Sequence, residues 1–486
     1  MKRKTAYGIF IAAFFILCLI PSAGMLLFGE SEAAANEILS PRPVIFQEDG
    51  SFNQNFTDDL TSYIADRFAF RQEFITAYAK IQAALFKESS SEDVVLGKDG
   101  WLFYQDTVDD YLHHNALSGR QIQGIARTLS MMQQYAEERG VRFVFTVAPN
   151  KNSLYPEYMP DVGDVFSGEK NLDMLEDVLD DYGIRYADLR EAFEDQPVLY
   201  YREDSHWNSR GAALGLACIT EQLDAEAYPW FDEPYRMEEN HKGDLYEMLY
   251  PAGKELEEDA VFDRKFGFSY LDSRTGEAMN ADYYSEDAPA DDSIRIDTFR
   301  EGAAGSLLMF RDSFGNALYP FMADTFENAT FSRLMPYRMD WLDGGTYDNL
   351  VVEIVERNLK NLALQAPVMP APIISLNGDV TDGGDASASA EISVSGDLAG
   401  YCMVSGIYDP AGIDEDTGIY ISFEGNGSGA AAVYEAFPVG NGTSRQQTDA
   451  CFTAYIPEEV LNESEFSVIL SKNGTLCRVS CEQIRK

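Results

Sequence analysis

The chain has 486 residues, enough for two or three domains at roughly 100 to 200 residues each. Apolar residues make up 45% and charged residues 24% of the chain, which disfavours wholesale disorder, collagen-like repeats and a polytopic membrane protein. The 37 Lys and Arg residues against 81 Asp and Glu give a net charge of −44. Because such a charge repels a phosphate backbone, we expect no nucleic-acid partner.

The N-terminus is a membrane-targeting element. Met1-Lys2-Arg3-Lys4 is basic, and the run from Tyr7 to Phe28 carries no charge and is long enough to cross about 30 Å of hydrocarbon as a helix. Residues 1–30 therefore predict a single-pass signal anchor that leaves the rest of the chain extracytoplasmic. The alternative is a cleaved leader and a secreted protein, because Ala33-Ala34-Ala35 offers small residues suited to a signal peptidase.

The next two regions differ in pattern. Residues 31–91 indicate a polar linker and then an amphipathic helical stretch that packs on the next domain of the chain. Over residues 92–365 helical and strand patterns alternate, which is typical of a parallel sheet covered on both faces. Strands are expected at 101–104, 141–147, near 186, 198–201, 292–298, 306–310 and 349–355, and helices at 120–139, 170–182 and 209–223. Residues 226–290 are acidic and break this alternation, so we interpret them as an insertion beside the sheet.

The C-terminal region, residues 366–486, shows no helical period of any length. Short apolar runs separated by Gly, Asn, Asp and Ser predict a small β-sandwich. Four of the six cysteines fall here, which suggests a disulfide-stapled domain; four free thiols are the alternative. They are Cys402, Cys451, Cys477 and Cys481, and the remaining two, Cys18 and Cys218, lie in the anchor and in an expected helix.

A serine follows the most apolar of the expected strands. Ser306 to Phe310 is a buried strand in pattern, and Arg311-Asp312-Ser313-Phe314-Gly315 forms a sharp turn into a helix. This places the Ser313 hydroxyl at the carboxyl end of a strand, where α/β sheets bind ligands, and the helix start offers backbone N–H groups to an oxyanion. The alternative is that Ser313 only caps the helix.

A second polar segment, Asp204-Ser205-His206-Trp207-Asn208, also comes after an expected strand and precedes a helix. In an extended segment Asp204 and His206 point the same way, so the carboxylate can orient the imidazole. The alternative is a surface loop whose Asp caps the next helix. Together with Ser313 the pair would supply nucleophile, base and orienting group for acyl transfer.

The motif set resembles the SGNH hydrolase superfamily, and within it the DHHW and alginate O-acetyltransferase-like envelope proteins. Over about residues 92–362 the set runs in the order that group shows: Gly97-Lys98-Asp99-Gly100-Trp101-Leu102-Phe103-Tyr104, then Asp204 to Asn208 with Gly211, then Asp312 to Asn316, then Val351 to Leu359. The resemblance implies a three-layer, flavodoxin-like α/β domain. Two positions depart from the family pattern: Arg311 replaces a usual Gly, and Ser205 replaces the second residue of the DHHW motif.

Carried over residue by residue, the resemblance implies that Ser313 is the nucleophile, His206 the general base and Asp204 its orienting carboxylate. It also implies an oxyanion site at the Ser313 and Gly315 backbone amides. Asn150, directly after the 141–147 strand, is the candidate side-chain donor, with a plain turn residue as the alternative. Candidate substrate contacts are Arg311, Lys151, Trp207 and Tyr201.

The other histidines suggest no further site. His113 and His114 carry no companion pattern, and His241 is isolated in the insertion, so we expect structural roles for them. No metal or cofactor is expected, because no His, Cys or carboxylate spacing typical of one occurs.

The sequence therefore predicts an extracytoplasmic O-acetyltransferase acting on an envelope or exported polysaccharide through an acetyl-serine. Since acetyl-CoA is cytoplasmic, the resemblance suggests a multipass membrane acyltransferase as acetyl donor. A carbohydrate acetyl-esterase and a non-catalytic carbohydrate-binding scaffold remain alternatives. The acidity favours a neutral or amino-bearing glycan.

Overall fold

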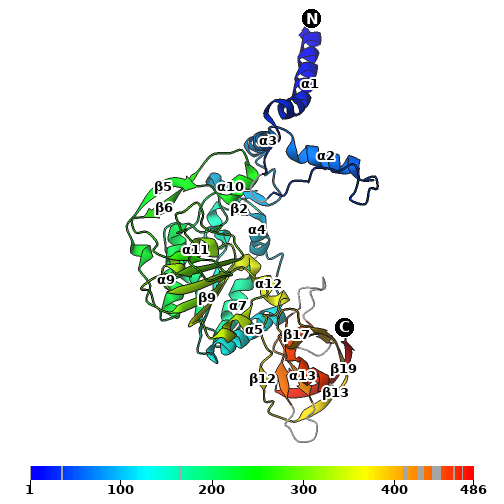
Figure 1. Cartoon of the computed structure of the whole chain (residues 1–486), viewed down its shortest axis with the longest axis vertical. Helices are drawn as coiled ribbons and strands as arrows, with labels where there is room; N and C mark the ends of the chain where they lie inside the picture. Colours follow the sequence, from blue (N-terminus) through cyan, green and yellow to red (C-terminus); the bar gives the residue numbers. More distant parts are fainter. Residues whose placement is uncertain are drawn as a thin grey trace.

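The computed structural model describes residues 2–33, 37–163, 167–408, 414–423, 432–439, 450–463, 466–472 and 474–485 (Figure 1). Helix α1 (Lys2–Phe28) leads into the chain, and its segment Tyr7–Phe28 is long and apolar enough to cross a membrane. This helix fits either a signal anchor or a signal peptide. Of the expected cleavage region, Ala34 and Ala35 lie outside the described residues.

The helical lead-in consists of two helices rather than one stretch. Helix α2 (Phe56–Arg67) and helix α3 (Arg71–Leu85) are separated by Phe70, which has a left-handed backbone with φ 63°. Helix α2 buries no residue, so the expected packing on the next domain is limited to α3, whose Thr76 and Ala79 are buried. Both helices project from the α/β domain in Figure 1.

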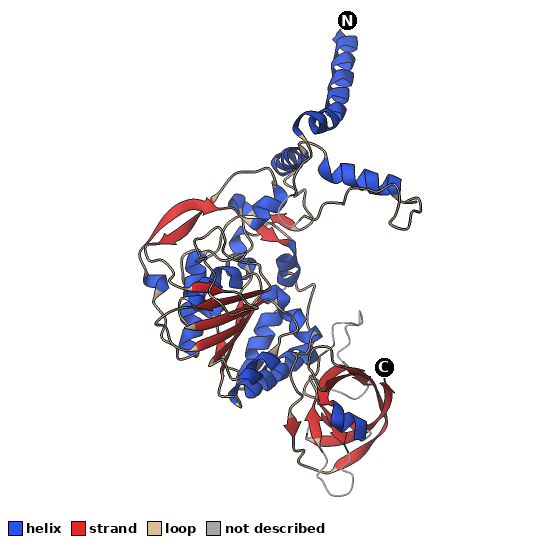
Figure 2. Cartoon of the chain, viewed as in Figure 1, coloured by secondary structure: helices blue, strands red, loops and turns tan. Residues whose placement is uncertain are grey.

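A seven-stranded sheet forms the centre of the α/β domain (Figure 2). Its order is β4 (Tyr186–Ala187), β3 (Arg142–Ala148), β11 (Asn349–Val355), β9 (Ser306–Phe310), β10 (Asn328–Ser332), β8 (Arg295–Phe299) and β7 (Ser269–Leu271). The first five strands are parallel, and β8 and β7 add an antiparallel edge. Because parallel strands share an orientation, the carboxyl ends of β3, β11 and β9 meet at one edge.

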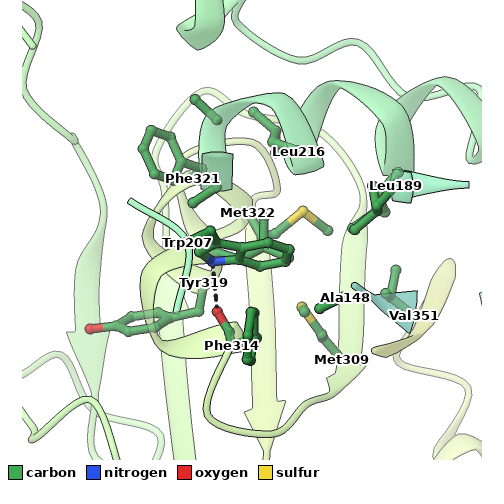
Figure 3. Close-up of a cluster of buried hydrophobic side chains, with 14 of the residues drawn as sticks. Ala148, Leu189, Trp207, Leu216, Met309, Phe314, Tyr319, Phe321, Met322 and Val351 are labelled. Atoms are coloured by element: carbon green, nitrogen blue, oxygen red, sulfur yellow. Dashed lines mark hydrogen bonds between the residues drawn. The ribbon is translucent and has the colours of Figure 1, made fainter. Parts of the chain in front are cut away.

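Two layers of helices cover this sheet, so the expected three-layer fold is confirmed. In strand β9, Leu307 and Met309 face one core and Leu308 and Phe310 face the other, as the two-residue period of a strand requires. Figure 3 shows the first core, where Met309 and Val351 of the sheet meet Leu216 and Trp207. Helix α9 (Ser209–Gln222) and helix α11 (Gly315–Ala323) pack there, and α5 (Gly119–Glu137), α7 (Asn171–Leu179) and α12 (Leu359–Leu364) pack in the second core.

Two details of the α/β domain differ from expectation. Residues 198–201 form no strand and contribute only an isolated bridge between Tyr200 and Trp207. Strand β10 was not expected, because its sequence Asn-Ala-Thr-Phe-Ser is too polar to indicate a buried strand. The short elements that complete the domain are β1 (Val94–Leu96), β2 (Leu102–Tyr104), α4 (Gln105–Tyr111), α6 (Lys151–Leu154) and α8 (Leu189–Glu194).

The insertion is more than a lateral addition. It forms a hairpin of β5 (Tyr235–His241) and β6 (Glu257–Phe262), with α10 (Asp244–Leu249) between them, and its last strand β7 joins the main sheet. The turn between β5 and α10 reaches the carboxyl edge of the sheet, where it supplies two residues to the candidate active site.

The C-terminal region is β-rich, but its strands form one continuous sheet instead of the two facing sheets of a sandwich. The sheet order is β12 (Ile373–Ile374), β16 (Val433–Glu435), β15 (Gly418–Phe423), β18 (Phe466–Lys472), β19 (Thr475–Arg485), β13 (Val380–Val394), β14 (Tyr401–Tyr408) and β17 (Cys451–Pro457). A bridge from Phe437 to Thr453 joins its two sides, so the sheet curls around with α13 (Glu458–Glu463) beside it (Figure 2).

The expected disulfide staple is wrong for the cysteines that the structure describes. Cys402 lies opposite Val394 and Ile456, and Cys451 lies opposite Ile407, so the strand register brings neither next to another cysteine. Cys218, Cys402, Cys477 and Cys481 are free thiols. The Cys18 side chain lies outside the described residues.

Candidate active site

The nucleophile turn is held by Asp312. Its Oδ1 accepts a hydrogen bond from the Phe314 amide at 2.9 Å, and its Oδ2 accepts from the Val355 amide at 2.8 Å and from Asn358 Nδ2 at 3.1 Å. The turn after β9 is thereby fixed to the end of the neighbouring strand β11. Ser313 does not cap α11, since the cap position is Phe314 and no side chain makes a capping bond there.

Gly315 is required by close packing in this turn. A Cβ at this position would lie 2.6 Å from the Cβ and Cδ atoms of Arg311. Within the described residues, the Phe314 amide is taken by Asp312, while the Ser313 and Gly315 amides donate to no protein acceptor. The two amides expected at an oxyanion are therefore available to a ligand.

Ser313, His206 and Asp204 touch in series. The Ser313 Oγ lies 2.9 Å from His206 Nε2, and His206 Nδ1 lies 2.8 Å from Asp204 Oδ1. A carboxylate only accepts, so the ring carries its proton on Nδ1 and presents Nε2 to the serine. The next helix, α9, is capped by Asn208 and not by Asp204, whose side chain is buried. The loops that carry the three groups lie over a hundred residues apart in the chain, at one edge of one sheet.

Asp204 is also contacted by His241, for which the sequence suggested only a structural role. His241 Nε2 donates to Asp204 Oδ2 at 2.9 Å, and the His241 ring stacks on Tyr201 with 3.7 Å between centroids. No local pattern surrounds this histidine, and only its scarcity in the sequence could have drawn attention to it.

Asp244 is a second acidic group beside the base. Its Oδ2 lies 3.5 Å from His206 Nδ1, and its two carboxylate oxygens accept from the Ser205 amide and hydroxyl at 2.7 and 2.5 Å. Ser205, the departure from the DHHW pattern, therefore holds Asp244 in place. Ligand atoms of Asp204, His206 and Asp244 lie within 4.8 Å of one another, a spacing that would allow a metal ion, but each atom already has a hydrogen-bond partner.

The electrostatics of the site favour an ionised Asp204 and a basic His206. Burial raises the pKa of Asp204, but the two histidines outweigh it and hold this pKa well below its usual range. Burial lowers the pKa of His206, whereas Asp204 and Asp244 raise it, and the net pKa lies above the ordinary value. Since 22% of the His206 side chain is exposed, the base is reachable from solvent.

Asn150 does not face the nucleophile. Its side chain is buried and donates from Nδ2 to Asp110 Oδ2 at 2.9 Å, while its amide donates to Glu356 at 2.7 Å. The sequence placed Asn150 correctly at the carboxyl edge of the sheet, where its amide group is committed to the buried carboxyl of Asp110.

The four expected substrate contacts are buried and hold the loops instead. Lys151 Nζ donates to the carbonyls of Tyr201, Arg202 and Asp204 at 3.2, 3.1 and 2.6 Å. Trp207 Nε1 donates to the Phe314 carbonyl at 3.1 Å, which ties the base loop to the nucleophile turn (Figure 3). Tyr201 is covered by His241. Their contact with a ligand stays a prediction; in the structure they act as long polar side chains next to a site often do, by satisfying buried backbone groups of its loops.

Arg311 is likewise turned away from the nucleophile. It is buried, and its guanidinium donates to Asn316 Oδ1 and to the Asp291 carbonyl, the latter at 2.7 Å. This residue gave the scaffold alternative its best sequence support. The Arg311 side chain packs closely against Gly315 and has its hydrogen-bond acceptors elsewhere, at Asn316 and Asp291.

Part of this chain is similar to known proteins. Residues 94–261 match the family model described as "SGNH hydrolase-like domain, acetyltransferase AlgX". The chain contains an SGNH hydrolase-like domain. The resemblance drawn from the motifs is thereby confirmed. The match includes Asp204, His206, His241 and Asp244 and ends before Ser313.

Curated and solved proteins are similar to part of this chain. The probable alginate O-acetylase AlgJ of Pseudomonas aeruginosa is 31% identical over 193 residues, which is 35% of this chain and 44% of that protein. The protein of the same name from Pseudomonas fluorescens is 23% identical over 231 residues, or 42% and 55%. The chain thus spans about half the length of these curated relatives. The structure of Bacillus cereus PatB1 aligns with 54% of this chain and 95% of its own at 20% identity and a TM-score of 0.43.

Proposed function

We propose that this protein is an extracytoplasmic O-acetyltransferase that acetylates hydroxyl groups of a cell-envelope or exported polysaccharide through an acetyl-Ser313 intermediate. The contact series from Ser313 Oγ through His206 to Asp204, at 2.9 and 2.8 Å, carries this proposal. The similarity to proteins named as alginate O-acetylases supports acetyl transfer to a polysaccharide.

In the first half-reaction His206 Nε2 takes the Ser313 proton as Oγ bonds to the acetyl carbonyl carbon, and the carbonyl π pair moves onto its oxygen. The Ser313 and Gly315 amides face the position of that oxyanion. The intermediate collapses when the bond to the leaving oxygen breaks and His206 returns the proton to it. In the second half-reaction a sugar hydroxyl attacks acetyl-Ser313 through the same steps and releases the serine.

The compartment of the protein determines which acetyl donor it can use, and the acceptor determines whether the reaction is transfer or hydrolysis. Helix α1 would anchor the enzyme with its catalytic domain outside the membrane, where acetyl-CoA is absent. A multipass membrane acyltransferase that passes acetyl groups outward would solve this supply problem. If water replaces the sugar hydroxyl, the same site acts as a carbohydrate acetyl-esterase; this alternative is favoured by the solvent exposure of His206.

The test compares the full-length detergent-solubilised protein with its Ser313→Ala variant, using p-nitrophenyl acetate and then an oligosaccharide acceptor. We expect Ser313→Ala to lower kcat/KM by at least about 10³-fold with an unchanged melting temperature. Mass spectrometry of the acceptor separates transfer from hydrolysis. Equal rates for wild type and variant would favour the non-catalytic scaffold.

A further inference from the structure

Arg357 is held next to the nucleophile turn. It lies in the short 3-10 helix η5 (Glu356–Asn358), directly after β11, and β11 pairs with β9, the strand before the Ser313 turn. The Val355 amide and the Asn358 side chain, on either side of it in sequence, both donate to Asp312 Oδ2 at 2.8 and 3.1 Å. Asp312, the residue before Ser313, therefore holds the short segment that carries Arg357.

The guanidinium of Arg357 and the His206 ring both lie near the side chain of Phe314. Its Cζ lies 5.5 Å from the centroid of Phe314, the residue after the nucleophile, and 5.3 Å from that of Tyr104. The His206 ring centroid lies 4.8 Å from the same Phe314 ring. Arg357 and His206 thus both lie near the aromatic side chain next to Ser313.

Among the residues that the structure describes, the guanidinium of Arg357 has no carboxylate partner. Arg357 is only 9% exposed, yet within the described residues it has no carboxylate within 4 Å and makes no hydrogen bond, and its Nη1 is buried without a partner. Some arginines of the chain are paired, as Arg127 is with Glu435 and Arg190 with Asp173 and Glu176. The buried Arg120 and Arg311 have no carboxylate partner either, but each donates to a backbone carbonyl. An unpaired guanidinium is costly to bury, so its retention beside Ser313 points to a ligand with negative charge.

The site needs a positive group there. Two carboxylates, Asp204 and Asp244, lie beside His206. Their negative charge opposes a further negative charge on an acyl oxygen. The side chain expected to stabilise that oxygen, Asn150, donates to Asp110. Lys151 is committed to three backbone carbonyls. Of these side chains in the described part of the chain, Arg357 is the one whose donors remain uncommitted.

We propose that Arg357 is a catalytic residue that donates a hydrogen bond to the oxyanion formed when Ser313 attacks the acetyl group, together with the Ser313 and Gly315 amides. The inference rests on the proposed function. In the step concerned, the Ser313 Oγ–carbon bond forms, the carbonyl π pair moves onto oxygen and the serine proton moves to His206. Arg357 stabilises the new charge and exchanges no proton.

The test measures p-nitrophenyl acetate hydrolysis by full-length Arg357→Met and Arg357→Lys, at a pH on the plateau of each profile. Because the substrate is neutral, we expect Arg357→Met to lower kcat by about 10²- to 10³-fold with little change in KM, and Arg357→Lys to retain part of the rate. The matched control is Arg264→Met, which removes a guanidinium over Tyr228 and Trp230 at the other end of α11. It should keep wild-type kcat.

A second measurement does not depend on the variants folding. A p-nitrophenyl methylphosphonate ester would leave a tetrahedral, anionic adduct on wild-type Ser313, and its crystal structure should place an Arg357 nitrogen within hydrogen-bond distance of a phosphonyl oxygen. A guanidinium beyond about 4.5 Å from every adduct oxygen, or unchanged kcat in Arg357→Met, would overturn the inference. If only transfer to an acidic acceptor fell, Arg357 would bind that acceptor and not the oxyanion. An inactive wild type would instead reject the proposed function.

Discussion

At the scale of single residues, Asp204 organises the site. Its Oδ1 accepts from the amide and the ring of His206, and its Oδ2 accepts from His241 Nε2 and the Asp244 amide, all at 2.8 to 2.9 Å. Four donors on a buried carboxylate keep it ionised and fix the orientation of the base. Two of the four donors come from the insertion, so that segment is part of the candidate active site.

A prediction at this scale concerns the acid limb of the pH profile. His206 must be neutral to act as a base, and its pKa is raised, so kcat/KM should fall as the pH drops through a value above 6.5. Asp244 contributes to that raised pKa, and Asp244→Asn should move the limb to lower pH while still accepting from the Ser205 amide. Asp263→Asn, which changes an exposed carboxylate, should leave the limb in place. An unmoved or upward-shifted limb in Asp244→Asn would contradict this account.

At the scale of elements, the site consists of two strand-to-helix turns that are bonded to each other. Trp207, just before α9, donates to the Phe314 carbonyl, just before α11, and both rings pack in the first core. Lys151 of α6 fastens the base loop from the other side, and burial lowers its pKa to about 8. The alignment of Ser313 and His206 therefore depends on the helices that begin just after them.

The corresponding prediction is that Trp207→Phe both destabilises and slows the enzyme. Losing the indole donor leaves a buried carbonyl unpaired, which should cost about 1–3 kcal/mol in the free energy of unfolding, and kcat should fall as the turns lose alignment. Trp230→Phe is the matched control, since Trp230 is equally buried but its Nε1 has no partner. Urea unfolding and p-nitrophenyl acetate kinetics should show a stability loss in both variants and a rate loss only in Trp207→Phe. Equal rate losses would refute the link.

At the scale of the whole molecule, an acidic chain buries several of its carboxyls. Burial raises the pKa of Asp110 to about 6 and those of Glu176 and Glu356 to about 7. The folded protein then binds more protons than the unfolded chain between about pH 5 and 7. Stability is therefore highest toward the acidic end of that window and is lost as the pH rises through the folded-state pKa values.

We accordingly expect the melting temperature to be several degrees higher at about pH 6 than at about pH 8 at constant ionic strength. Glu356→Gln, which cannot titrate, should reduce this difference, and Glu286→Gln, which changes a solvent-exposed carboxylate, should leave it unchanged. A protein that is more stable at the higher pH, or a Glu356→Gln variant with the full difference, would count against these buried carboxyls as the cause.

The sequence alone determined the local part of this protein. Strands such as Asn349–Val355 are apolar on both faces, and a run of this kind specifies a buried parallel strand without knowledge of its neighbours. His206 and Ser313 each lie within a local sequence pattern of a strand followed by a helix, so both could be placed at one edge of the sheet from the sequence. The polar strand β10 was not predicted, because its burial comes from its neighbours and not from its composition.

Tertiary structure alone decided what joins the site from elsewhere. His241 and Asp244 arrive on an inserted hairpin, Arg357 on the turn after a neighbouring strand, and the C-terminal strands close into one sheet through Phe437 and Thr453. It also turned Asn150, Lys151 and Arg311 toward buried polar groups and away from the nucleophile. The physical reason is range: periodicity and turn chemistry act over a few residues, whereas a contact between distant segments forms only after the core has packed and each buried charge has met its partners.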